Sequence, residues 1–167
     1  MTISVNEAKL ELTLLNSNVL DLDRIDVFAR FTNAEMPSEI VFRLGELWEQ
    51  TKVVGGKIIH IGKIVINEIL KFIENNPNLV LGVALGAAIG AIVSLIPYLG
   101  PIIAPLTMLV GATLGGVVGS RLDRDKKAVH WIEDISQELI LLAKKFFEFF
   151  AAIFIALKDD FSKSTQE

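Results

Sequence analysis

The chain contains 167 residues, of which 51% are hydrophobic, and its formal net charge is −4. One compact helical unit fits this length, while the mean hydropathy of +0.50 is high for a soluble protein. The acidic balance makes nucleic acid an unexpected partner, and the lack of Cys excludes disulfides and thiolate chemistry.

Residues 1–35 form an N-terminal segment whose pattern fits two kinds of structure. Leu10–Leu14 alternates between apolar and polar residues as a strand does, whereas Ser4 followed by Glu7 is typical of a helix capping box. We expect short helices here. Charged residues interrupt this segment early, so it is not expected to be a secretory signal peptide.

Residues 36–76 have the pattern of one long amphipathic helix, with Ser38 placed to cap its start. At 100° per residue, its apolar and polar residues fall on opposite sides. The apolar side contains Val41, Leu44, Trp48, Ile59, Ile66, Ile69 and Ile73. Gly55, Gly56 and Gly62 weaken an isolated helix, so either close packing offsets this or the helix bends there.

Residues 77–120 carry no charged side chain, and their small residues recur every fourth position in two sets. The sets are Gly82, Gly86, Gly90 and Ser94, and then Thr107, Gly111, Gly115 and Gly119. They lie symmetrically about a point between Gly100 and Pro101, which predicts a helical hairpin that folds back there. In lipid, such stripes let two backbones approach closely, so we expect these residues to pack the helices together.

The two halves of this segment, 79–96 and 102–119, are each about 18 residues long, or roughly 27 Å as helices. That length is close to the hydrocarbon thickness of a bilayer. The expected turn contains Pro97, Tyr98, Gly100 and Pro101. The alternative is a buried pair of core helices in a soluble protein.

Basic residues flank the uncharged segment on both sides, which predicts cytoplasmic termini and an inner (cytoplasmic) membrane location. A cluster after the segment is expected to meet lipid headgroups, either as a general anchor or by specific recognition of anionic lipid. The cluster consists of Arg121, Arg124, Lys126 and Lys127.

Residues 121–160 are expected to form a second amphipathic helix, followed by a polar tail at 161–167. Its predicted apolar stripe contains Ile132, Ile135, Leu139, Leu142, Phe146, Phe149 and Ile153. A third span is disfavoured because Lys144, Lys145 and Glu148 are costly in lipid. The helix is expected either to pack in a bundle or to lie in the membrane plane with its phenylalanines near lipid.

The sequence contains no recognisable catalytic or metal-binding motif, and no cofactor is expected. The glycines have no following Lys-Ser or Lys-Thr, and no Ser lies in a G-x-S-x-G turn. His60 and His130 are expected to be solvent-facing or interfacial. We therefore predict that the chain is not an enzyme.

The repeats Gly82-x-x-x-Gly86-x-x-x-Gly90 and Gly111-x-x-x-Gly115-x-x-x-Gly119 resemble those of bacterial glycine-zipper membrane proteins, which have two spans. This resemblance implies packing within a membrane. The apolar hairpin with flanking amphipathic helices also resembles the hydrophobic hairpins of pore-forming colicin domains and phage holins.

We therefore expect an all-α protein with a transmembrane helical hairpin between two long amphipathic helices. The leading functional hypothesis is a non-enzymatic integral membrane protein that acts as an oligomeric scaffold or binds a protein partner. The first alternative is a membrane-permeabilising, pore-forming effector, and the second is a soluble helical protein with a buried hairpin. The few polar side chains in the uncharged segment disfavour a water-filled pore.

Overall fold

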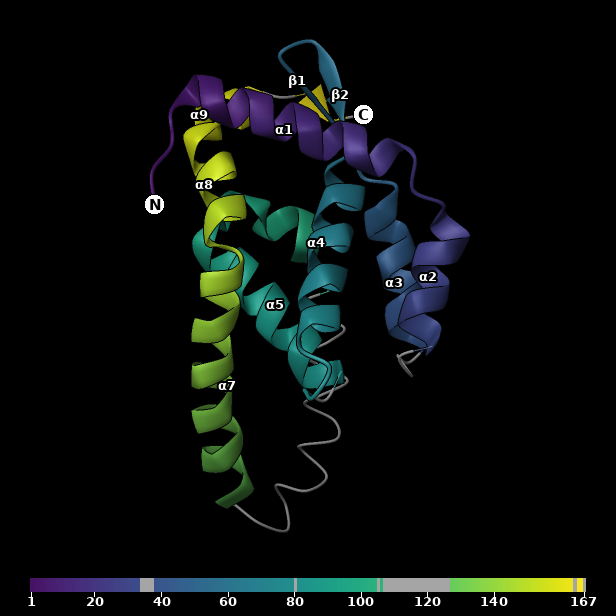
Figure 1. Ribbon diagram of the computed structural model, residues 1–167, viewed down its shortest axis with the longest axis vertical. Coiled ribbons are helices and arrows are strands. Elements are labelled where there is room, and N and C mark those ends of the chain that lie inside the picture. The colour runs from purple at the N-terminus through teal and green to yellow at the C-terminus, as the bar shows by residue number, and fades with distance from the viewer. Residues whose placement is uncertain (34–37, 80, 105, 107–126, 164, 167) are drawn as a thin grey trace.

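The computed structural model describes residues 1–33, 38–79, 81–104, 106, 127–163 and 165–166. These residues are mostly helical and include one small antiparallel sheet (Figure 1). The expectation of a mainly helical chain is therefore confirmed, although the sheet was not predicted.

The N-terminal segment folds into two helices, α1 (Val5–Leu20) and α2 (Arg24–Asn33). The Ser4 hydroxyl accepts a hydrogen bond from the Glu7 backbone N–H at 3.1 Å, which caps α1. This confirms the expectation of helices over that of a strand. Figure 1 shows α1 lying across one end of the molecule, where it packs on α8 and α4.

The expected helix over residues 36–76 is instead two helices separated by a β-hairpin. Helix α3 (Ser38–Trp48) is followed by strands β1 (Lys52–Val54) and β2 (Lys57–Ile59), and then by α4 (Ile61–Asn75).

The turn of this hairpin requires its two glycines. Gly55 and Gly56 have φ angles of 60° and 78°, and Val54 pairs with Lys57 across the turn. Two successive positive φ angles are typical of the tight turns that join antiparallel strands, and glycine adopts them without steric cost. A third strand, β3 (Thr165–Gln166), pairs antiparallel with β1, so the strand order is β2-β1-β3.

Most of the residues that were predicted to face the core of this region are buried, although the helix is interrupted. Leu44 and Trp48 of α3 are buried, as are Ile66 and Ile69 of α4. The burial of Ile59 in β2 keeps the hairpin on the same core. The helical period therefore identified the buried residues correctly. It predicted a helix, however, where the β-hairpin lies.

The uncharged segment begins with α5 (Leu81–Leu95) and the 3-10 helix η1 (Pro97–Leu99). Pro97 disfavours a helical conformation at the residue before it, and Ile96 has an extended φ of −129°. Helix α5 therefore ends here, and the chain bends by 118° between Val83–Leu95 and Pro97–Ala104.

The C-terminal region is divided into α7 (Lys127–Phe146), α8 (Glu148–Ala156) and α9 (Lys158–Ser162). The break between α7 and α8 is slight, because the Phe147 N–H still bonds the Ala143 carbonyl at 2.9 Å. The next such bond, from the Ala151 N–H to the Phe147 carbonyl, is 2.8 Å long. The two helices therefore run as nearly one rod (Figure 1).

The buried face of this rod differs from the predicted stripe. Leu142 and Phe149 are 45% and 41% exposed, whereas Ala143, Phe147 and Phe150 are buried. Among the described residues, Ile153 is buried and Leu139 and Phe146 pack against the core as predicted, so the stripe is wrong only at Leu142 and Phe149. Residues 146–157 are almost all apolar, so polar positions around Phe149 do not mark clearly which side faces water. The predicted polar tail also begins too early, since Phe161 in α9 is buried.

Candidate functional site

Helix α5 is the candidate functional element because all fifteen of its residues are uncharged. It packs chiefly against α7 and α4, and also touches α8 and η1. Its buried residues include Ala84, Leu85, Ala87, Ala88, Ile89, Ala91 and Ile92. The apolar faces of two amphipathic helices thus cover an apolar helix.

The small-residue stripe lies on the less buried side of α5. Gly86 and Gly90 are half-buried, and Ser94 is exposed. A Cβ on Gly90 would lie 3.8 Å from the Ile140 side chain of α7, which is an ordinary contact distance. The contact seen at Gly90 therefore leaves room for a side chain.

The predicted partners of this stripe, Thr107, Gly111, Gly115 and Gly119, lie outside the described residues. Gly82 begins the stripe within the backbone of α5. The predicted packing of one set of small residues against the other thus stays a prediction.

The turn residues lie at the bend, but the bend is not where the symmetry placed it. Gly100 has φ −49° and ψ −51°, which is helical, and Pro101 continues that helical turn. The change of direction comes earlier, at Ile96 and Pro97, because proline restricts the residue that precedes it. The described chain therefore changes direction before Gly100, whereas the fold-back of the second half stays a prediction because residues 107–119 lie outside the described residues.

Tyr98 ties this bend to the C-terminal helices. Its hydroxyl donates a hydrogen bond to the Phe154 carbonyl of α8 at 2.5 Å. Its ring centre lies 5.6 Å from that of Phe161 in α9. Tyr98, which was expected in the turn, therefore connects the bend to the chain's own helices.

The phenylalanines of the C-terminal rod join the core rather than forming one exposed face. Phe147 lies 5.7 Å from Phe72 of α4, measured between ring centres. Phe150 and Phe154 are 4.7 Å apart, and Phe154 and Phe161 are 5.4 Å apart. Core packing of this aromatic group is therefore favoured over contact with lipid in this arrangement.

Within the described residues, no single helix combines the length and the apolar character needed to cross a bilayer. The bent pair Val83–Leu95 and Pro97–Ala104 meets that test jointly. Helix α5 runs from Leu81 to Leu95 and is therefore shorter than the expected span of residues 79–96. Its 15 residues are about 22 Å long as a helix.

The proposed headgroup residues Arg121, Arg124 and Lys126 lie outside the described residues, and Lys127 begins α7. Among the described residues, no group of His, Asp and Glu is arranged to hold a metal ion. His60, just before α4, is half-buried, and its backbone N–H donates to the Asn16 side chain at 2.8 Å. Burial, and then the nearby charge of Lys63, lower the pKa of the His60 imidazole.

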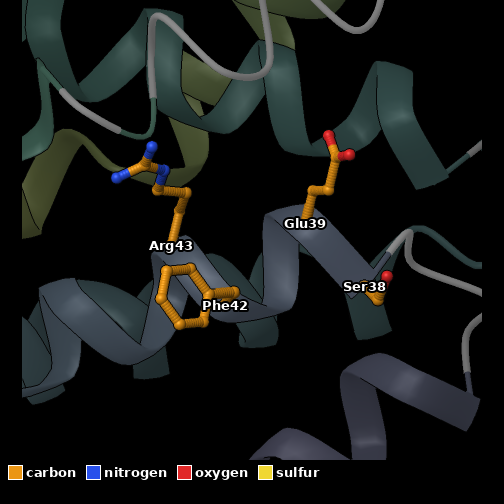
Figure 2. Close-up of a pocket in the computed structure, with 4 residues that line it drawn as sticks. All are labelled: Ser38, Glu39, Phe42 and Arg43. Carbon is orange, nitrogen blue, oxygen red and sulfur yellow. The ribbon is translucent and has the colours of Figure 1, made fainter.

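A hollow beside α3 is a feature that the sequence did not reveal. Its volume is about 320 Å³, and its described lining consists of Ser38, Glu39, Phe42 and Arg43. Figure 2 shows Glu39 and Arg43 extending to the same side of the helix, with Phe42 on an adjacent side. The Phe42 side chain is 67% exposed, and the Arg43 guanidinium pairs with Glu46 at 3.0 Å. Glu39 and Arg43 are exposed, so the described lining of the hollow carries its charges at the surface.

Comparison with known proteins finds no matching family, curated protein or solved structure.

Proposed function

We propose that the chain is a non-enzymatic membrane protein whose uncharged segment, residues 77–120, enters the bilayer. Its amphipathic helices form a scaffold at the membrane surface that self-associates and binds a protein partner. The observation that carries this proposal is α5, which has 15 residues without a charge and is followed by a bend. A charge at the centre of a span costs roughly 3 kcal/mol, so a long segment without any charge favours lipid.

The proposal has a consequence for the arrangement of the helices. In the described structure, α4 and α7 cover α5 with their apolar faces. Charged residues on the outer faces of these helices, such as Lys71 and Lys145, oppose burial of those faces in hydrocarbon. Entry of α5 into lipid therefore requires α4 and α7 to separate from it and lie along the membrane surface.

The test is co-flotation of the purified protein with liposomes, using a charge placed at Ser94. Ser94 is exposed in the described arrangement, so Ser94→Lys should leave the fold nearly unchanged. In a bilayer, the added charge costs about 1–3 kcal/mol, so membrane association should weaken about fivefold to a hundredfold.

Two variants serve as controls for this experiment. Ser94→Ala changes the same position without adding a charge, and Ser17→Lys adds the same charge at an exposed position of α1. Both should float like the unmodified protein. Equal flotation of Ser94→Lys would contradict entry of α5, and a monodisperse detergent-free monomer that does not float would contradict the membrane assignment.

The second candidate function is membrane permeabilisation. The burial of α5 within its own chain favours it, because a covered helix allows an apolar segment to be carried through water before it meets lipid. Release of dye from liposomes separates this candidate from the scaffold.

A further inference from the structure

The outer side of α7 carries a short stripe of exposed residues with alternating chemistry. Leu141 and Leu142 are 65% and 45% exposed, and Glu138 and Lys145 on either side of them are also exposed. Spacings of three and four residues place all four side chains on one face of the helix. This face is called the α7 stripe below.

The α7 stripe points away from the core of its own chain. Ala143, on the opposite side of α7, is fully buried, and Ile140 approaches Gly90 of α5. Separation of α7 from α5 would thus leave the stripe directed away from the apolar face that meets lipid. The stripe is available to a partner in water in either arrangement.

The four residues form a sequence that is complementary to itself when reversed. A point between Leu141 and Leu142 has one leucine on each side, and then Glu138 and Lys145 at equal distances. If two copies pair antiparallel about this point, each Glu138 meets the other copy's Lys145 and the leucines meet at the centre. Neither Glu138 nor Lys145 forms an ion pair with another described residue, so both charges are available.

We propose that the α7 stripe is a twofold, antiparallel interface between two copies of this chain. A twofold interface uses the same patch on both copies, which a reversible pattern of this kind satisfies. Parallel pairing would set Glu138 against Glu138 and Lys145 against Lys145, so it is disfavoured by like charges. This proposal rests on the proposed function in one respect, namely that the two copies associate at a membrane. Confinement in the membrane plane raises the effective concentration of the two copies, which helps a small interface to form.

Charge reversal tests the pairing directly. Glu138→Lys or Lys145→Glu alone creates two repulsive contacts in each dimer, and we expect either variant to self-associate about tenfold more weakly. The double variant Glu138→Lys/Lys145→Glu restores opposite charges in the antiparallel dimer and should recover its affinity. Sedimentation equilibrium in mild detergent measures these affinities.

Cross-linking tests the position of the twofold axis. The chain has no Cys, so a single Cys introduced at Leu141 or at Leu142 is the only thiol. At least one of these variants should form a disulfide-linked dimer on mild oxidation. Leu10→Cys is the matched control, since Leu10 is 60% exposed on α1 and lies outside the stripe.

Several results would overturn the proposal. Single reversals that leave the affinity unchanged would do so, as would a double variant no better than the singles or cross-linking no stronger than at Leu10→Cys. Lys57→Glu, a reversal at an exposed position of β2, should have no effect on self-association. Liposome flotation of each variant is measured in parallel. A variant that self-associates more weakly but still floats supports the interface. If the unmodified protein does not float with liposomes, the proposed function fails, whatever the result for the interface.

Discussion

At the scale of single residues, Gly62 has less room for a side chain than the other glycines compared in the described part of the chain. A Cβ added there would collide with the Leu47 carbonyl oxygen and lie 2.7 Å from its carbon, and both are backbone atoms. The start of α4 must therefore move away from the end of α3. We predict that Gly62→Ala lowers the free energy of unfolding by about 3 kcal/mol, measured by chemical denaturation followed by circular dichroism.

Gly100 supplies the matched control for that substitution. Its φ of −49° is helical, and a Cβ there would meet nothing within 4 Å. Gly100→Ala should be neutral or stabilise the fold by about 0.4–1 kcal/mol, because alanine restricts the unfolded chain. If the two substitutions had equal effects, the tight contact at Gly62 would be refuted.

His60 gives stability a dependence on pH. Its pKa in the folded protein is lowered, first by burial and then by Lys63, so the unfolded chain binds a proton more readily. This contribution to stability is fully present above the usual histidine pKa of 6.5 and is lost as the pH falls through the lower, folded value. We predict that acidification below about pH 6.5 destabilises the protein more than it does His60→Gln. Parallel pH slopes of the unfolding free energy in the two proteins would contradict this.

At the scale of elements, Asn16 joins α1 to the junction between the hairpin and α4. Its side-chain nitrogen donates to the Ile58 carbonyl at 3.1 Å, and its side-chain oxygen accepts from the His60 N–H at 2.8 Å. We predict that Asn16→Ala lowers the free energy of unfolding by about 1–2 kcal/mol. Asn18→Ala, on an exposed position of the same helix, should change it by less than about 0.5 kcal/mol. Equal losses in the two variants would contradict the stabilising role of this pair of bonds.

The elements also show which features of the fold can be predicted from sequence patterns. Ser4 predicted the start of α1 correctly because its capping bond is local. The helical period across residues 36–76 found the buried residues but missed the β-hairpin, because strand pairing depends on contacts between segments and on the positive φ angles at Gly55 and Gly56. In the C-terminal rod the period failed at Phe149, because residues 146–157 are almost all apolar and give the period little contrast between the two sides.

At the scale of the whole molecule, composition predicted a helical chain with an uncharged centre, and the structure has both. It did not predict that α4, α7 and α8 would cover α5, or that Tyr98 would bond to Phe154. These contacts join residues far apart in the sequence. A symmetric pattern of glycines carries no information about such contacts, because small residues allow close approach without specifying which element approaches.

The number of polar side chains in the uncharged segment decides whether this segment anchors the protein or permeabilises the membrane. Ser94 is the only residue of α5 with a polar side chain, and Tyr98 directs its hydroxyl to Phe154. A water-filled path along α5 would therefore have few groups to replace the hydration of an ion. We predict that liposomes carrying the protein at high density retain an encapsulated dye as well as protein-free liposomes do.

Release of dye that is abolished by Gly86→Leu, with the variant still bound to the liposomes, would instead assign the chain to the permeabilising class. Gly86 is half-buried on the less covered side of α5, so this substitution fills the space beside the helix without adding a charge.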